Sequence, residues 1–363
     1  MKKNKNYVGL KDQPVPEGQH LLEVDDLKMY FHTEDGVVRA VDGVSYTLDR
    51  GETLGVVGES GSGKSVTAMT IMGLISMPPG KIEGGDVRYR GRSILEMTEE
   101  EMQHIRGNDI AMIFQDPMTS LNPVYKIGKQ VGEGLRLHRG YSKQEALKRA
   151  TELLDLVGIP EPEKRVNEYP HQFSGGMRQR VMIAMALACD PDILIADEPT
   201  TALDVTIQAQ IIELMQEMQE KNGNAIIMIT HDLGVVADMA DKIMVMYAGR
   251  PVEFGTAEEI FYESRHPYTW GLIRSIPEQA IEEKKPLTPI HGNPPSLMNL
   301  PEGCVFSPRC PYATDKCRKQ RPERVVTESG HYSACHYSGD PEFLKNAPET
   351  SRTRKDSKKG GEA

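Results

Sequence analysis

Short apolar segments alternate with longer amphipathic ones over most of the chain. Four of them are almost continuously apolar, which is typical of strands buried on both faces of a sheet: residues 51–57, 110–114, 193–196 and 225–229. Residues 242–254 contain two further apolar runs around an Ala-Gly-Arg turn, and this pattern predicts a hairpin that closes the domain.

Two segments between these strands have helical periodicity. The apolar residues of segment 142–157 fall on one stripe, formed by Ala146, Leu147, Ala150, Leu153, Leu154 and Val157. Segment 205–221 repeats the pattern, with Asp204 as a candidate N-cap and Gly223 as its end. Strands that alternate with helices predict an α/β fold, in which a sheet is flanked by helices.

The pattern changes after residue 260, where prolines and glycines multiply and helical periodicity fades. We therefore expect four regions: a flexible leader (1–20), an α/β domain (21–260), a small irregular module (261–340) and a disordered basic tail (341–363). A module with so little periodicity lacks a core of its own, and it needs a staple to hold a fold.

Composition narrows the class of protein. The chain has 363 residues, 38% of them hydrophobic and 26% charged, which is ordinary for a soluble globular protein. Its net charge of −10 argues against a general nucleic-acid binder. The longest apolar stretch, from Val181 to Cys189, has nine residues, about half of what a membrane-spanning helix needs. The basic N-terminus has no apolar segment behind it, so we expect no signal peptide and a cytoplasmic location.

The first candidate site follows the strand at 51–57. The sequence from Gly58 to Ser65 has the form G-x-x-x-x-G-K-S/T, and residues 66–74 after it predict a helix. In this context the backbone curls around a polyphosphate, Lys64 reaches the β- and γ-phosphates, and Ser65 binds Mg²⁺. The alternative is a plain glycine turn. The candidate nucleotide-binding residues are Gly58, Glu59, Ser60, Gly61, Ser62, Gly63, Lys64, Ser65 and Val66.

Two carboxylates end the strand at 193–196. Asp197 is placed to hold Mg²⁺, and Glu198 extends beyond it. A second carboxylate beside the metal suits a base that orients water and takes its proton, so the pair predicts hydrolysis of the nucleotide. The alternative is an exposed acidic strand end.

A second anion cradle precedes the helix that contains Val181. Ser174-Gly175-Gly176-Met177 offers bare N–H groups at a helix start. One nucleotide does not need two cradles from the same subunit more than 100 residues apart. We therefore expect this signature segment (174–177) to contact ATP held by another subunit, in a dimer with ATP at the interface.

Together these motifs resemble the ATP-binding cassette (ABC) family. The resemblance implies a P-loop cassette with a mixed sheet core and a helical subdomain at about 116–175. It also implies that Gln115 contacts Mg²⁺, that His231 contacts the γ-phosphate, that Phe31 (or Tyr30) stacks on adenine, and that Asp204 ends the D-loop. Glu198, His231 and Lys64 would be the catalytic residues. Phe173 and Met177 replace the leucine and glutamine of the commonest signature, and Thr201 replaces a serine, but none of these changes removes a cradle or a carboxylate.

A narrower resemblance is to the D-type ATPase subunits of bacterial oligopeptide and dipeptide importers. Segments 114–123, 169–180, 197–210 and 266–272 carry it. It implies a peripheral subunit on the cytoplasmic face of the membrane, with two permeases, a second and different ATPase subunit, and an extracytoplasmic peptide-binding protein. The chain itself would contact neither peptide nor nucleic acid. Importers of nickel or other small solutes, and a soluble cassette ATPase of DNA repair or the ribosome, are the alternatives.

Four of the five cysteines lie in the irregular module. Cys304, Cys310, Cys317 and Cys335 are separated by five, six and seventeen residues, whereas Cys189 is a lone core residue. Four thiolates can bind zinc or an iron–sulfur cluster, although zinc modules usually space their cysteines two to four residues apart. The resemblance to peptide importers implies a 4Fe–4S cluster here. Zinc and unligated thiols are the alternatives, and the default role is structural, with redox sensing as a second option.

Overall fold

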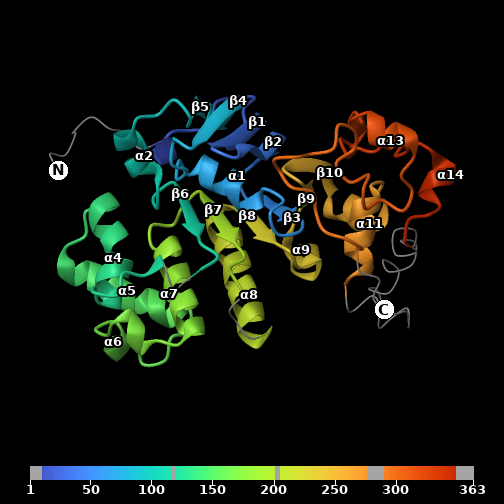
Figure 1. The fold of residues 1–363 in the computed structure, drawn as a ribbon. Helices are drawn as coiled ribbons and strands as arrows, with labels where there is room; N and C mark the ends of the chain where they lie inside the picture. Colours follow the sequence, from blue (N-terminus) through green and yellow to red (C-terminus); the bar gives the residue numbers. More distant parts are fainter. Residues whose placement is uncertain (1–9, 117–119, 201–204, 277–289, 349–363) are drawn as a thin grey trace.

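The central element of the protein is an eight-stranded mixed sheet with the order β11-β12-β10-β9-β3-β8-β7-β6 (Figure 1). The computed structural model describes residues 10–116, 120–200, 205–276 and 290–348. The parallel strands are β3 (Thr53–Val57), β6 (Ile110–Ile113), β7 (Ile193–Asp197), β8 (Ala225–Thr230) and β9 (Lys242–Tyr247). The antiparallel strands are β10 (Arg250–Thr256), β11 (Val325–Val326) and β12 (Tyr332–Ser333).

The four strands predicted from continuous apolar runs are confirmed to within two residues, as is the hairpin. Every residue of β3, β6, β7 and β8 is buried. Successive side chains of a strand point to opposite faces. Ile193 and Ile195 accordingly enter one core and Leu194 and Ala196 the other.

One face of the central sheet is covered by a smaller antiparallel sheet and helix α1 (Lys64–Ile71) (Figure 1). The smaller sheet has the order β2-β1-β4-β5. Its strands are β1 (Leu22–Thr33), β2 (Gly36–Leu48), β4 (Gly80–Tyr89) and β5 (Arg92–Ser93). No continuous apolar run marks these strands, because β1, β2 and β4 mix buried with exposed positions and β5 has only two residues, neither of them buried.

Helices cover the opposite face, and a group of helices lies beside the sheet (Figure 1). That group contains α4 (Ile127–His138), α5 (Lys143–Leu156), α6 (Pro162–Arg165) and α7 (Gly175–Leu187). The helices α2 (Glu99–Ile105), α8 (Val205–Asn222) and α9 (Leu233–Met239) complete the cassette. No helix among the described residues is both long and apolar enough to span a membrane.

The two predicted helices form as α5 and α8. Ser142 caps α5 in a reciprocal arrangement with Glu145. Leu147 was placed on the apolar stripe of α5 but is exposed, because it lies at the edge of the stripe, about 100° from Ala146. Helix α8 ends before Gly223, whose φ of 68° suits glycine. Asp204, its candidate cap, lies outside the described residues.

The irregular module packs on the cassette instead of standing apart from it. Its helices are short: α10 (Ala257–Tyr262), α11 (Pro267–Arg274), α13 (Asp315–Lys319) and α14 (Pro341–Leu344). Strand β12 pairs with β10, so the module extends the central sheet. The rings of Tyr247, Tyr268 and Phe306 lie 4.6–5.3 Å apart and join the module to the cassette core. The module therefore shares the core of the α/β domain instead of having one of its own, and its need for a staple stays a prediction.

Both ends of the described chain are ordered in part, contrary to the expected loose leader and tail. Leu10–Asp12 forms a 3-10 turn, and Leu10 is buried in the core beside the smaller sheet. In the predicted tail, Phe343 on α14 packs against Trp270 and Tyr312 at 5.3 and 5.5 Å. Single apolar side chains, Leu10 and Phe343, hold these ends. The segments around them are too short to show a periodic pattern in the sequence.

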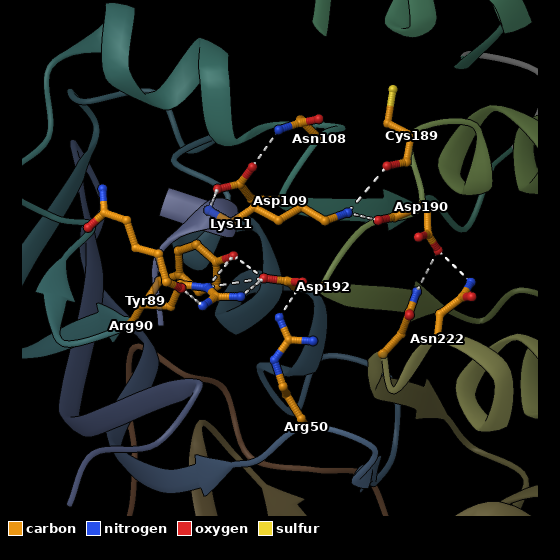
Figure 2. Close-up of polar contacts among 12 residues, drawn as sticks. Lys11, Arg50, Tyr89, Arg90, Asn108, Asp109, Cys189, Asp190, Asp192 and Asn222 are labelled. Atoms are coloured by element: carbon orange, nitrogen blue, oxygen red, sulfur yellow. Dashed lines mark hydrogen bonds and ion pairs between the residues drawn. The ribbon is translucent and has the colours of Figure 1, made fainter. Parts of the chain in front are cut away.

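A polar network closes the amino-terminal edge of the parallel strands (Figure 2). Asp192, just before β7, accepts hydrogen bonds from the Tyr89 hydroxyl at 2.6 Å, Arg90 Nη2 at 2.5 Å and Arg50 Nη2 at 2.9 Å. Asp109, just before β6, accepts the Lys11 N–H at 3.0 Å, and Lys11 Nζ donates to the Asp190 carbonyl. The network ties the N-terminal segment to the sheet at the edge opposite the candidate site.

This network gives a prediction for pH. Burial raises the pKa of Asp109 from 3.8 to about 6, so the folded chain holds this proton more tightly than the unfolded chain does. Protonation of Asp109 makes its whole contribution to the free energy of unfolding below about pH 4. This contribution is lost as the pH rises through about 6. Asp109→Asn cannot ionise, and we expect its stability relative to the parent to rise by about 1–2 kcal/mol between pH 4.5 and 7.5.

Urea unfolding of the full chain at several pH values measures this difference. Asp315→Asn, which changes a carboxylate that is 85% exposed, is the control. Its free energy of unfolding relative to the parent should not change with pH. A pH-independent difference for Asp109→Asn would contradict the raised pKa of Asp109.

Candidate functional site

The predicted functional residues gather at the carboxyl ends of the parallel strands. The phosphate loop (58–65) follows β3, Gln115 follows β6, Asp197 and Glu198 end β7, and His231 follows β8. Strands β3, β8, β7 and β6 are neighbours in that order, and their parallel direction brings these ends to one edge of the sheet. Crevices at this edge are the usual ligand sites of open α/β sheets.

Two glycines allow the phosphate loop to lie close to the backbone of Met246 and Ala40. Gly58 and Gly63 have φ of 151° and 102°. A Cβ on Gly58 would lie 2.2 Å from the Met246 carbonyl oxygen, and one on Gly63 would lie 2.3 Å from that of Ala40. Only glycine fits both positions. The buried Ser62 hydroxyl has no hydrogen-bond partner among the described residues, so the loop offers a donor that an anion could use.

Lys64 lies under this loop with 5% of its surface exposed. Its ammonium donates to the carbonyl oxygens of Gly58 at 2.7 Å and Glu59 at 3.0 Å. Burial lowers the pKa of Lys64, while the nearby carboxylates of Glu198, Asp197 and Glu59 act in the opposite direction. A bound polyphosphate would supply further negative charge and favour the ammonium form.

The three predicted Mg²⁺ ligands line one cleft. Ser65, Gln115 and Asp197 border a cleft of about 420 Å³, and the Ser65 hydroxyl donates to Asp197 Oδ1 at 3.0 Å. Burial raises the pKa of Asp197, and Glu198 raises it further, so a cation would be favourable here. The described residues contain no group of three His, Cys, Asp or Glu side chains able to hold a metal alone. This fits Mg²⁺, which takes one or two carboxylates and completes its shell with phosphates and water.

Glu198 is oriented by side chains from both neighbouring strands. Gln115 Nε2 donates to Glu198 Oε2 at 2.9 Å, and His231 Nδ1 lies 3.3 Å from Glu198 Oε1. The Glu198 backbone has a φ of 48°, an uncommon conformation for a residue other than glycine, and its N–H donates to the Ile229 carbonyl at 2.9 Å. Residues held in such conformations cluster at functional sites.

The remaining predicted residues stand apart from this group or outside the described chain. Phe31 on β1 is half-buried against the core beside the smaller sheet, and Tyr30 donates its hydroxyl hydrogen to Asp42. The signature segment begins α7, where the Ser174 hydroxyl accepts the Met177 N–H at 3.3 Å. Phe173, one of the departures from the commonest signature, is buried in the core. Asp204 and the rest of the D-loop at 201–204 lie outside the described residues.

Sequence reasoning missed two residues that touch the phosphate loop. Tyr268 and Arg309, both from the C-terminal module, bind Glu59. Tyr268 lies in segment 266–272, which carries the family resemblance but indicates no contact with the loop. Arg309 belongs to none of the motifs. The separations from Glu59 are 209 and 250 residues, so no local pattern signals either contact.

The fold and the site together define a P-loop ATPase of the ABC class. Comparisons with known proteins agree. The profile of the ABC transporter family matches residues 41–201, and that of the "Oligopeptide/dipeptide transporter, C-terminal region" matches residues 252–317.

Individual relatives cover most of the chain. The oligopeptide transport ATP-binding protein OppD of Bacillus subtilis is 58% identical over 86% of this chain and 87% of its own length. The dipeptide transport ATP-binding protein DppD of Escherichia coli is 52% identical over 88% of this chain and 97% of its own length. Among solved structures, the ATP-binding cassette MJ0796, a dimer bound to ADP and Pi, is 29% identical with a TM-score of 0.60, and covers 65% of this chain and 98% of that one.

The chain therefore belongs to the ABC transporter ATPases, in the branch that contains the oligopeptide and dipeptide transport ATP-binding proteins. The fold class and the family resemblance expected from the sequence are confirmed.

Proposed function

We propose that this chain is the ATP-hydrolysing subunit of an importer for oligopeptides or dipeptides, bound to the cytoplasmic face of a bacterial membrane. The observation that supports the proposal is that Glu198 contacts Gln115 and His231, and Ser65 contacts Asp197, in a chain whose C-terminal region matches peptide transporters. The names of OppD and DppD, at 58% and 52% identity, support the substrate class.

Hydrolysis follows from the contacts around Glu198. The phosphate loop and Lys64 bind the triphosphate, and Phe31 provides a flat ring for adenine. Mg²⁺, held by Ser65, Asp197 and Gln115, would neutralise charge on the phosphates. Glu198 takes a proton from the attacking water, and Gln115 and His231 fix its two carboxylate oxygens. The His231 side chain is 62% exposed, so it could exchange this contact with Glu198 for one with the γ-phosphate.

A second ATPase subunit would complete the site. The signature segment lies at the N-terminus of α7 with Ser174 and Gly175 exposed, and a Cβ on Gly175 would meet no described atom within 4 Å. Glycine is therefore not required there by contacts within the subunit, which suits the close approach of a partner's ATP. We extend the proposal to a heterodimer on two permeases, supplied by an extracytoplasmic peptide-binding protein.

Purification of the tagged chain from detergent-solubilised membranes tests this assembly. We expect two permeases and a second ATPase to copurify, and cells without the chain to lose uptake of a labelled tripeptide but not of nickel ions. Loss of nickel uptake alone would favour the small-solute alternative. A chain that stays out of the membrane fraction and binds none of these partners would contradict the proposal.

A metal centre in the C-terminal module is the second part of the proposal. Cys304, Cys310, Cys317 and Cys335 all line one small pocket beside His266 and Phe306, but no three of these side chains form a metal-binding group among the described residues, so the thiols would have to move together around a bound metal. Burial raises the pKa of Cys310 to about 11 and that of Cys335 to about 12, so without a metal both thiols stay protonated. A donor set of four cysteines suits a 4Fe–4S cluster, with zinc as the alternative, and either would staple the module.

Cys310→Ser tests this centre. We expect about four iron atoms and about four acid-labile sulfides per parent chain. Because the variant lacks one ligand of four, both contents should fall by more than half. The measurement is metal and sulfide analysis of protein purified without oxygen. Cys189→Ala, at the cysteine outside the pocket, should keep its iron. Stoichiometric zinc, or no metal in the parent, would contradict the cluster.

A further inference from the structure

The C-terminal module reaches the ATP site through one residue, Glu59 of the phosphate loop. The Glu59 N–H donates to the Tyr268 hydroxyl oxygen at 2.9 Å. Arg309 donates to both oxygens of the Glu59 carboxylate, through Nη1 to Oε2 at 2.7 Å and through Nη2 to Oε1 at 3.1 Å. The module thus holds both the backbone and the side chain of this residue.

Contacts other than the one with Glu59 also hold Arg309 in place. Its side chain is 5% exposed, its Nε donates to the His291 carbonyl at 3.0 Å, and its Nη2 donates to the Ile290 carbonyl at 3.2 Å. The guanidinium also lies over the Tyr247 ring, 5.8 Å from the centroid. A paired guanidinium in such a setting has little freedom, so the position of Glu59 follows that of the module.

Glu59 in turn holds the phosphate-binding lysine. The Glu59 carbonyl accepts a hydrogen bond from Lys64 Nζ at 3.0 Å. A chain of contacts therefore runs from Arg309 and Tyr268, through the side chain and peptide of Glu59, to the ammonium of Lys64. A shift of the Glu59 peptide would redirect both Lys64 and the start of the loop whose N–H groups face the phosphates.

We propose that Arg309 and Tyr268 are positioning residues of the ATP site, and that the C-terminal module sets the affinity of the phosphate loop for nucleotide through them. The inference rests on the ATP site described above. It gives the module a role in nucleotide binding in addition to any metal that it holds.

The test is the affinity of the full-length chain for Mg²⁺·ADP, measured by titration calorimetry. Arg309→Gln removes a partly buried two-bond ion pair, and we expect the Kd to rise about 10-fold. Arg309→Lys keeps the charge but not the fork, so its Kd should lie between those of the parent and the glutamine variant. Arg318→Gln is the matched control: its ion pair with Asp315 is exposed on both sides, and its Kd should not change.

Two further readouts separate positioning from general stability. In the double variant Glu59→Gln/Arg309→Gln, the two losses should be less than multiplicative, because both changes remove the same contact. In the membrane assembly, Arg309→Gln should raise the KM for ATP about 10-fold and change kcat less than 3-fold, because the contact holds bound nucleotide and does not touch the attacking water. Iron content and melting temperature are measured on the same samples, since Arg309 is next to Cys310.

Tyr268→Phe covers the case in which Arg309→Gln does not fold. It removes only the hydroxyl that accepts the Glu59 N–H, and it should raise the Kd about 3- to 10-fold. An unchanged Kd in folded, equally loaded Arg309→Gln and Tyr268→Phe, with only the melting temperature lowered, would overturn the inference. A parent chain that does not bind Mg²⁺·ADP would instead overturn the ATP site itself.

Discussion

Glu198→Gln should bind ATP as tightly as the parent and lose about 10²- to 10⁴-fold in turnover, the range measured for loss of a general base. Glutamine has the shape of glutamate and can keep a contact with Gln115 through its amide, but it cannot take a proton from water. Because ATP binding depends on the phosphate loop and Lys64, the substitution separates binding from hydrolysis.

Phosphate release by the membrane assembly, together with nucleotide affinity, measures both quantities for Glu198→Gln. Glu152→Gln on α5 changes a half-exposed glutamate paired with Arg149, and it should match the parent in both. Hydrolysis at the parent rate in Glu198→Gln would remove Glu198 from the role of base.

Lys64→Met should weaken nucleotide binding by at least an order of magnitude. The ammonium is buried, and its loss removes a positive charge from the phosphate loop and leaves the Gly58 and Glu59 carbonyls without this donor. Truncating one side of a buried, hydrogen-bonded charge contact costs about 2–5 kcal/mol, which corresponds to about 30- to 5,000-fold in affinity. Methionine has nearly the same length, so packing in the loop changes little.

Calorimetric titration with Mg²⁺·ATP measures the effect of Lys64→Met. Lys81→Met removes an exposed lysine paired with Glu83 and should leave the affinity unchanged. If Lys64→Met bound Mg²⁺·ATP within 3-fold of the parent, the phosphates would have to lie elsewhere than over this loop.

Four parallel strands of the central sheet were predictable because they are buried on both faces. Each of β3, β6, β7 and β8 is an uninterrupted apolar run, which leaves little ambiguity in a sequence. The smaller sheet was not predictable in the same way. Strand β1 alternates buried and exposed positions irregularly and has register shifts between Val24 and Phe31. A bulge interrupts the period of two on which strand prediction depends.

The site was predictable where a motif is local. The phosphate loop and the strand-end carboxylates each lie in one short segment with a chemical reason for its residues. Gln115 and His231 were assigned only by resemblance, and their shared contact with Glu198 appears only when β6, β7 and β8 lie side by side. The bonds from Tyr268 and Arg309 to Glu59 cross more than 200 residues, and no spacing rule connects such positions.

The most direct test of the account is ATP hydrolysis by the purified assembly in proteoliposomes, with a peptide-loaded binding protein in the compartment opposite the ATPases. We expect the peptide to stimulate hydrolysis several-fold, labelled peptide to cross the membrane in step with ATP consumption, and both to stop with Glu198→Gln. Hydrolysis that is indifferent to peptide, or that rises instead with nickel, would contradict the account of this chain as the motor of a peptide importer.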